Sequence, residues 1–184
     1  DFEGGIRTAL RALLASPQFI FRFEQVPSGV STGEQYQISN IELASRLSYF
    51  LWGTIPDEEL ITFAIEHGFD NQDAVEVQIR RMLTDSRAEA FGTRFAAQYL
   101  RLQDLEKLHP DAIQYPQYDR TLTQSLRRET ELFFEHLVRE DRNILELLDA
   151  PYTFVNERVA KHYGIQNVTG NRFRQVNLPN ERRG

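Results

Sequence analysis

Residues 119–140 read DRTLTQSLRRETELFFEHLVRE and contain the longest helical pattern of the chain. The apolar positions of this stretch recur at intervals of mostly three to four residues and their multiples, which places them on one face of a helix. They are Leu122, Leu126, Phe133, Leu137 and Val138. We expect a helix that begins at Asp119 or Thr121 and ends near Glu140. A helix of this length favours an α-helical fold over a β-sheet fold.

Shorter helical patterns lie on both sides of this stretch. Ser39 and Glu42 form a capping box, in which each side chain binds the other residue's backbone N–H and starts a helix. Pro56-Asp57-Glu58-Glu59 is typical of another helix start, because acidic groups are favourable at the positive end of the helix dipole. Further patterns cover residues 74–83, 87–102, 144–148 and 156–163, and alternation with a period of two residues is almost absent. The sequence therefore predicts an all-α fold, an irregular bundle of about six to nine helices.

Composition excludes several classes of function. The 184 residues are 41% hydrophobic, which suffices for one sizeable core. Twenty-one basic and 27 acidic side chains give a net charge of −6, which would repel nucleic acid and anionic membrane surfaces. No apolar run approaches the ~20 residues that a membrane span needs. The absence of cysteine excludes disulfides, thiolate metal sites, cysteine nucleophiles and covalent attachment of c-type haem to this segment.

The four histidines do not form a metal-binding motif. None of His67, His109, His136 and His162 stands in an H-E-x-x-H or E-x-x-H arrangement, so we assign no metal ligand. His162 is the best candidate for a polar network, because Arg158 lies one helical turn before it and Tyr163 follows it. We interpret it as a structural histidine held by hydrogen bonds.

Some other side chains stand out by their positions. Glu129 falls near the apolar face of the long helix, so we expect it to be partly buried and paired with Arg158 or Arg46. Trp52 ends a helix beside Gly53 and could reach the surface. The candidate network, functional or structural, contains Trp52, Glu129, Asp141, Asn156, Arg158 and His162, and we assign none of these residues a catalytic or cofactor-binding role.

The stretch from Tyr152 to Gly164 combines aromatic, amide, charged and imidazole groups, and we read it as one short helical segment. If it is structural, Asn156 should cap the last helix and Gly164 should end it. Tyr152 and Phe154 should then be buried against the long helix.

Four motifs carry a resemblance to a known family: residues 47–60 (LSYFLWGTIPDEEL), Glu129-Thr130-x-x-Phe133-Phe134, Glu140-Asp141 and residues 152–158 (YTFVNER). The chain resembles a domain of unknown function in large planctomycete-type proteins, many of which carry a cytochrome c-like domain. The resemblance runs from about Ser39 to Tyr163. It implies a main helical domain at 39–164, with residues 1–25 as the helical tail of a preceding domain. Residues 165–184, which include a strand-like stretch at 173–178, would begin a following domain.

The same resemblance implies a piece of a longer protein that is exported, to the periplasm or the outside of the cell. Neighbouring domains of the same polypeptide would be its partners, and any haem would belong to one of them. The resemblance names no catalytic residue.

Three hypotheses follow from these observations. The first is a non-catalytic helical scaffold or interaction domain within a multidomain, redox-associated protein that is linked to cytochrome c. The second is a hydrolase or polysaccharide-active enzyme that uses the carboxylates Glu129 and Asp141 with His162. In the third, His162 or another histidine of this chain completes a haem pocket that a neighbouring domain contributes.

Overall fold

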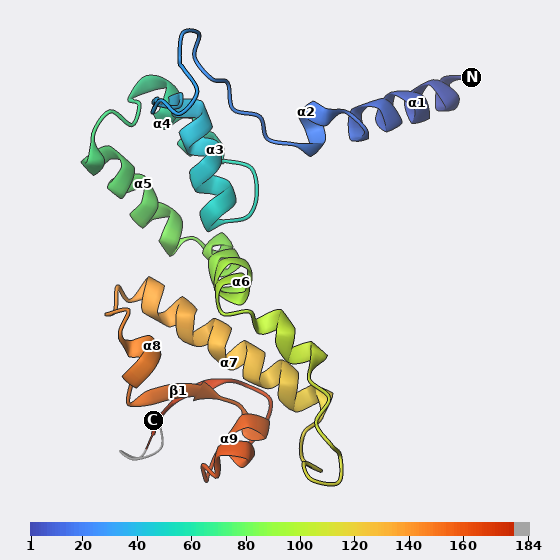
Figure 1. Cartoon of the computed structure of the whole chain (residues 1–184), viewed down its shortest axis with the longest axis vertical. Coiled ribbons are helices and arrows are strands. Elements are labelled where there is room, and N and C mark those ends of the chain that lie inside the picture. The colour runs from blue at the N-terminus through green and yellow to red at the C-terminus, as the bar shows by residue number, and fades with distance from the viewer. Residues whose placement is uncertain (179–184) are drawn as a thin grey trace.

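The structure, a computed structural model, describes residues 1–178. It is mostly helical, as predicted, and consists of an N-terminal arm and two lobes joined by a helical junction (Figure 1). The arm and the N-terminal lobe contain α1 (Phe2–Leu14), α2 (Pro17–Ile20), α3 (Asn40–Leu51), α4 (Glu58–Glu66) and α5 (Gln72–Thr84). The junction contains η1 (Ser86–Ala88), η2 (Phe91–Ala96), α6 (Ala97–Tyr99) and η3 (Leu102–Lys107). The C-terminal lobe contains α7 (Arg120–Arg139), α8 (Glu146–Asp149), β1 (Tyr152–Val155), α9 (Glu157–Tyr163) and β2 (Arg174–Asn177).

Capping residues set the helix starts of the N-terminal lobe. The predicted capping box is present, since Ser39 Oγ accepts the Glu42 N–H at 3.3 Å and Glu42 Oε2 accepts the Ser39 N–H at 2.9 Å. Asp57 caps α4 through the Leu60 N–H at 3.0 Å. Helices α3, α4 and α5 and the segments next to them enclose one core. Its residues are Ala44, Leu51, Trp52, Leu60, Ala64, Phe69, Met82 and Ala88.

The junction packs closely on α7. η2 is a π-helical segment, and its Gly92 approaches the α7 backbone so closely that a Cβ atom there would lie 3.3 Å from the Glu131 carbonyl oxygen. Phe91 and Phe134 meet beside this contact with ring centroids 5.5 Å apart. A second link is ionic, because Arg128 of α7 binds Glu89 at 2.7 Å. The close approach at Gly92, the ring contact and the ion pair therefore join the junction to α7 of the C-terminal lobe.

The long helix α7 is the centre of the C-terminal lobe, as its sequence pattern predicts. Its N-cap is Asp119, which accepts the Leu122 N–H at 2.7 Å. One core cluster lies on the second half of α7 and contains Phe133, Leu137, Ala150 and Tyr152. Another, on its first half, contains Val155, Val159 and Ala160, with Leu126 packed against it.

The stretch 152–155 differs from the prediction, because it is a strand and not part of a helix. β1 pairs with β2 in antiparallel register, with Tyr152 opposite Asn177 and Val155 opposite Arg174. Residues 152–155 are β-branched or aromatic, and three of the four are buried although they face both sides of the strand. Burial on both sides removes the apolar–polar alternation that would reveal a strand in the sequence.

β2 lies in the stretch that we expected to begin a following domain, and it completes the small sheet with β1. Phe173 and Val176 pack against the α9 core cluster beside it. Residues 179–184 of the same stretch lie outside the described residues.

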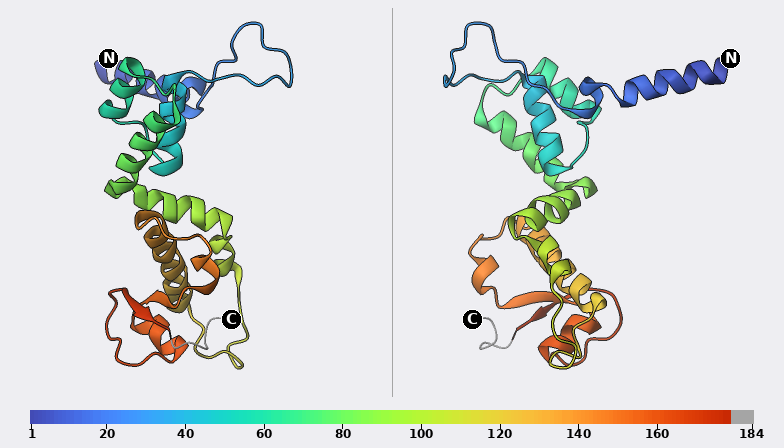
Figure 2. Two further views of the ribbon diagram at one scale, coloured as in Figure 1. Left: turned by 90° about the vertical axis from the view of Figure 1, so that its left-hand side faces the viewer. Right: turned by 45° about the vertical axis from the view of Figure 1, so that its right-hand side comes forward.

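The arm, residues 1–23, extends from the N-terminal lobe away from the rest of the molecule (Figures 1 and 2). No residue of α1 is buried. Among the described helices, none is both long enough and apolar enough for a transmembrane segment.

Candidate functional site

A buried polar network joins α7, β1 and α9, and Glu129 is at its centre. The Glu129 side chain lies on the apolar face of α7, and the residue is 7% exposed, as its helical phase predicted. One carboxylate oxygen accepts a hydrogen bond from Thr153 Oγ1 at 2.5 Å, and the other accepts one from Tyr163 Oη at 2.8 Å. The carboxylate thereby ties together three elements that are distant in the sequence.

Asn156 forms a second link between α7 and α9. Its Oδ1 accepts the Val159 N–H at 3.0 Å, which is the N-cap that the sequence predicted for this helix. Its Nδ2 donates to Ser125 Oγ at 3.1 Å. Both donor and acceptor of this second bond are buried, so Asn156 serves as a helix cap and as a cross-link in the core.

The position of Arg158 differs from the prediction that it pairs with Glu129. Its guanidinium lies 3.0 Å from Asp119 Oδ2 and also donates to the Gln117 carbonyl. The pKa of Asp119 is lowered by the Leu122 N–H bond and by Arg158, against a smaller opposing effect of burial. Arg46, the other predicted partner, binds Glu24 at the root of the arm. Each of these arginines therefore forms an ion pair with a carboxylate other than Glu129.

Glu129 lies at the floor of an open groove of about 540 Å³. Thr130, Thr153 and Tyr163 line the same groove, and the walls are otherwise mainly apolar. The wall residues are Tyr99, Leu100, Phe133, Ile144, Leu145, Leu147 and Leu148. Ile144, Leu145 and Leu148 are 61%, 60% and 77% exposed, so the rim offers apolar side chains to the solvent. A groove with apolar walls and one acidic group at its floor suits contact with another protein better than acid–base chemistry.

A family model described as PSD4, protein of unknown function (DUF1592), matches residues 38–165. The chain belongs to this family. No curated protein and no solved structure matches it. Glu129, Thr153, Asn156 and Tyr163 all lie within the part that matches the DUF1592 model, whereas the arm and β2 lie outside it.

The other predicted candidates of this DUF1592 chain do not converge on Glu129. Asp141 follows the C-terminal end of α7 with a positive φ of 48°. Twelve residues separate it from Glu129, which is about 18 Å along a helix, whereas the two carboxyl groups of a glycosidase lie within about 10 Å of each other. His162 is exposed, and its ring meets the Tyr163 ring at a centroid distance of 5.5 Å. His162 therefore does not lie in a buried network, and its role as a structural histidine held by hydrogen bonds stays a prediction.

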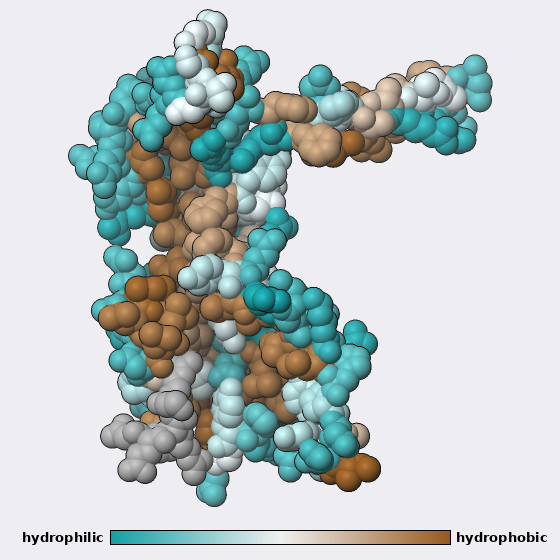
Figure 3. All heavy atoms as spheres, viewed as in Figure 1, coloured by the Kyte–Doolittle hydropathy of each residue, from teal (hydrophilic) through white to brown (hydrophobic). Residues whose placement is uncertain are grey.

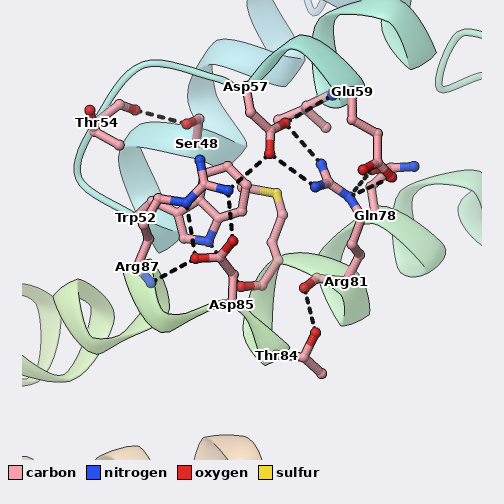
Figure 4. A network of polar contacts seen from close by, with 12 residues as sticks. Ser48, Trp52, Thr54, Asp57, Glu59, Gln78, Arg81, Thr84, Asp85 and Arg87 are labelled. Atoms are coloured by element: carbon pink, nitrogen blue, oxygen red, sulfur yellow. Dashed lines mark hydrogen bonds and ion pairs between the residues drawn. The ribbon is translucent and has the colours of Figure 1, made fainter.

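Trp52 also differs from the prediction, because it does not reach the surface. It is 3% exposed, and its Nε1 donates to the Met82 carbonyl at 2.9 Å. The Arg87 guanidinium covers the ring at 3.5 Å from the ring centroid. Figure 4 shows Trp52 beneath a network of charged side chains.

This network is centred on Asp57 and was missed by the sequence analysis. Asp57 accepts hydrogen bonds from Arg81 at 3.0 and 3.1 Å and from Arg87 at 3.0 Å. The Arg81 contact is the main reason that the pKa of Asp57 falls to about 2, although partial burial opposes the change. Arg87 likewise lowers the pKa of Asp85 to about 2. The side chains satisfy one another, so the network is structural, and its 24- to 30-residue spacings leave no local signal in the sequence.

Thr153 and Tyr163 were likewise not identified as partners of Glu129. Each lies in the quoted segment 152–163, but only the turn from β1 into α9 brings both to the same carboxylate. Within residues 1–178 no three side chains of the His, Asp or Glu type are arranged to hold a metal ion.

Proposed function

We propose that this chain is a non-catalytic helical interaction domain, a scaffold whose exposed apolar surfaces bind other protein surfaces. The observation that supports it most directly is the accessible area. The chain exposes 13451 Å², whereas a compact monomer of 21.5 kDa would expose about 9,200 Å². Large exposed apolar patches mark interaction sites on soluble proteins.

The exposed apolar side chains gather in three places. The first is the arm, where Phe2, Leu13 and Phe19 are 61–82% exposed. The second is the place where α3 meets the junction, and there Phe50 of α3 and Tyr99 of α6 are 52% and 72% exposed. The third is the rim of the groove beside α8. Figure 3 shows apolar residues on the arm and down the middle of the body.

The finer part of the proposal concerns the context of the domain. We propose that it belongs to a multidomain, exported, redox-associated protein of the planctomycete type, with neighbouring domains of the same polypeptide as its partners. The support is the resemblance of the quoted motifs, together with membership of the DUF1592 family. The absorption spectrum of the complete gene product tests this part. A c-type Soret band with an α-band would support the cytochrome link, and a colourless product would contradict it.

Limited trypsin digestion tests the interaction role. Arg7 and Arg11 in the arm and Arg142 beside α8 are exposed cleavage sites. We expect trypsin to cut at these sites in the dilute isolated chain and to spare at least one of them in the complete gene product. Equal rates of cutting in both proteins would contradict an interaction role for these surfaces.

A second candidate function is supported by one observation. Glu129 is a buried carboxylate that contacts the Tyr163 hydroxyl at the floor of a groove, which is a setting for a hydrolase acid. Under this alternative the chain would hydrolyse ester or glycoside substrates, and Glu129→Gln would abolish turnover without unfolding the protein. Absence of turnover by the folded chain would eliminate it.

A further inference from the structure

The arm has the pattern of a helix that docks on an apolar surface. Phe2, Ile6, Leu10 and Leu13 follow one another at intervals of four, four and three residues and therefore lie on one face of α1. They are 82%, 46%, 52% and 61% exposed. A helix of 13 residues is only marginally stable in water by itself. The apolar face of α1 therefore needs a surface to cover it.

The arm of one copy is held away from the apolar surface of its own body. At the root of the arm, Glu24 forms an ion pair with Arg46, and the Gln25 N–H donates to Glu42 Oε1 at 2.7 Å. The Arg22 guanidinium lies 5.6 Å from the Tyr49 ring centroid. These contacts fix the root on α3, and from there α1 points away from α6 (Figures 1 and 2).

The body carries a matching apolar surface, which we name the aromatic stripe: Phe50, Phe91, Phe95 and Tyr99. On η2 and α6 the rings recur every four residues, with centroids 4.9 Å apart from Phe91 to Phe95 and 5.9 Å apart from Phe95 to Tyr99. Phe50 of α3 meets Phe95 edge to face at 5.4 Å. Phe50, Phe95 and Tyr99 are 52%, 37% and 72% exposed. Tyr99 also lines the groove beside α8, so the stripe continues into it.

The two surfaces match in length and kind. The anchors Phe2 to Leu13 span about 16 Å of helix, and the stripe from Phe91 to Tyr99 spans about 12 Å before the groove extends it. Helix anchors at intervals of three and four residues are the usual means by which an amphipathic helix binds an apolar groove. Both surfaces belong to one chain, so two copies related by a two-fold axis can cover both at once.

We propose that the arm of one copy seats on the aromatic stripe of a second copy, in a symmetric dimer that exchanges its arms. The inference deepens the proposed interaction role by naming a second copy of this chain as the partner of the arm. Both surfaces are accessible: the four arm anchors are 46–82% exposed, and Phe50, Phe95 and Tyr99 of the stripe are 37–72% exposed.

Sedimentation of the 184-residue chain, from micromolar to hundreds of micromolar concentration, tests the proposal. The variants are Leu10→Asp in the arm and Tyr99→Asp in the stripe, at positions that are 52% and 72% exposed. The control is Ile113→Asp, which changes a 91% exposed apolar residue on the loop before α7. We expect dimers for the wild type and the control, and monomers for the two variants.

The mixture of the two variants distinguishes arm exchange from any other dimer. A copy with an intact arm can seat it on a copy with an intact stripe, so an equimolar mixture of Leu10→Asp and Tyr99→Asp should form a dimer with one working contact. We expect its dissociation constant to be at least about tenfold weaker than that of the wild type. Three results would each overturn the inference: a monomeric wild type at every concentration, a variant that dimerises like the wild type, or a mixture that stays monomeric.

Sedimentation and trypsin digestion together distinguish failure of the second-copy inference from failure of the proposed interaction role. If the chain is monomeric but trypsin spares the arm in the complete gene product, another domain covers the arm and the second-copy inference fails alone. If the arm is also cut freely in the complete gene product, the proposed role of the arm fails as well.

Discussion

At the scale of single residues, the C-terminal lobe depends on buried polar side chains that each bind two elements. Asn156 caps α9 and also donates to the buried Ser125. Asn156→Ala should therefore cost more than the roughly 1 kcal/mol of a lost cap, because it also leaves the Ser125 hydroxyl without this donor. We expect a total of about 2 kcal/mol in the free energy of urea unfolding.

The matched control is Asn156→Ser, which keeps an oxygen at the cap position and should lose clearly less stability than the alanine variant. Equal losses for serine and alanine would show that the cap oxygen contributes nothing here.

The bond from Thr153 to Glu129 is a second residue-scale test. Thr153 is 1% exposed, and its replacement by valine removes a donor to a buried carboxylate while preserving the side-chain shape. We expect Thr153→Val to lower the free energy of unfolding by about 1–3 kcal/mol. Thr130→Val is the control, because Thr130 Oγ1 bonds only the Leu126 carbonyl of its own helix among the described contacts, and it should change stability by less than about 0.5 kcal/mol. A control that costs as much as Thr153→Val would refute a special role for the Glu129 network.

At the scale of elements, Asp57 joins α4, α5 and η1 through Arg81 and Arg87. Its pKa is lowered from 3.8 to about 2 in the folded state, so the stabilisation is complete above the ordinary pKa and is lost as pH falls toward 2. A change of this size in a side chain that is 23% exposed corresponds to roughly 2 kcal/mol. Asp57→Asn should lower stability by about this amount at neutral pH and flatten the acid limb of the pH–stability curve.

The comparison is with Asp73→Asn, a change in the first turn of α5 at an exposed side chain. Urea unfolding of both variants between neutral pH and pH ~2 should give the Asp73 variant the slope of the wild type. An Asp57→Asn curve that runs parallel to the wild type over the same range would argue against the network as the source of acid sensitivity.

The contact of η2 with α7 is the second prediction at this scale. A side chain at Gly92 would press on the Glu131 carbonyl, so Gly92→Leu should destabilise the protein by about 1–3 kcal/mol, although leucine has the better helix propensity. Thr93→Leu, at the next position of η2, should be nearly neutral in thermal unfolding. Gly92→Leu with the stability of the wild type would mean that the lobes are free to move apart at this contact.

At the scale of the whole molecule, the parts that depend on local signals were predictable from the sequence. The caps Ser39 and Asn156 and the burial of Glu129 follow from residues within one or two helical turns. The burial of Trp52 does not, because its hydrogen-bond partner Met82 is 30 residues away. The strand-like stretch at 173–178 does contain β2, but β1 was missed, because its residues are buried on both faces and show no apolar–polar alternation.

The extended shape of the whole molecule likewise could not be predicted from the sequence. The periodicity of α1 predicts an apolar face, but a periodic pattern states nothing about whether the chain itself covers that face. Only the structure shows that all of α1 is unburied and that the total accessible area is that of an extended molecule. The arrangement of the elements is therefore the reason to expect that partner surfaces cover this area.

Amide hydrogen exchange of residues 1–23 in the complete gene product, compared with the dilute isolated chain, tests this claim most directly. We expect the amides of α1 to exchange near the unfolded rate in the isolated chain. In the complete gene product they should exchange at least about tenfold more slowly, because a docked helix must first leave its partner surface. Amides of α7 provide the internal reference, since they should be protected in both samples. Unprotected α1 amides in both samples, with α7 protected in both, would contradict the account.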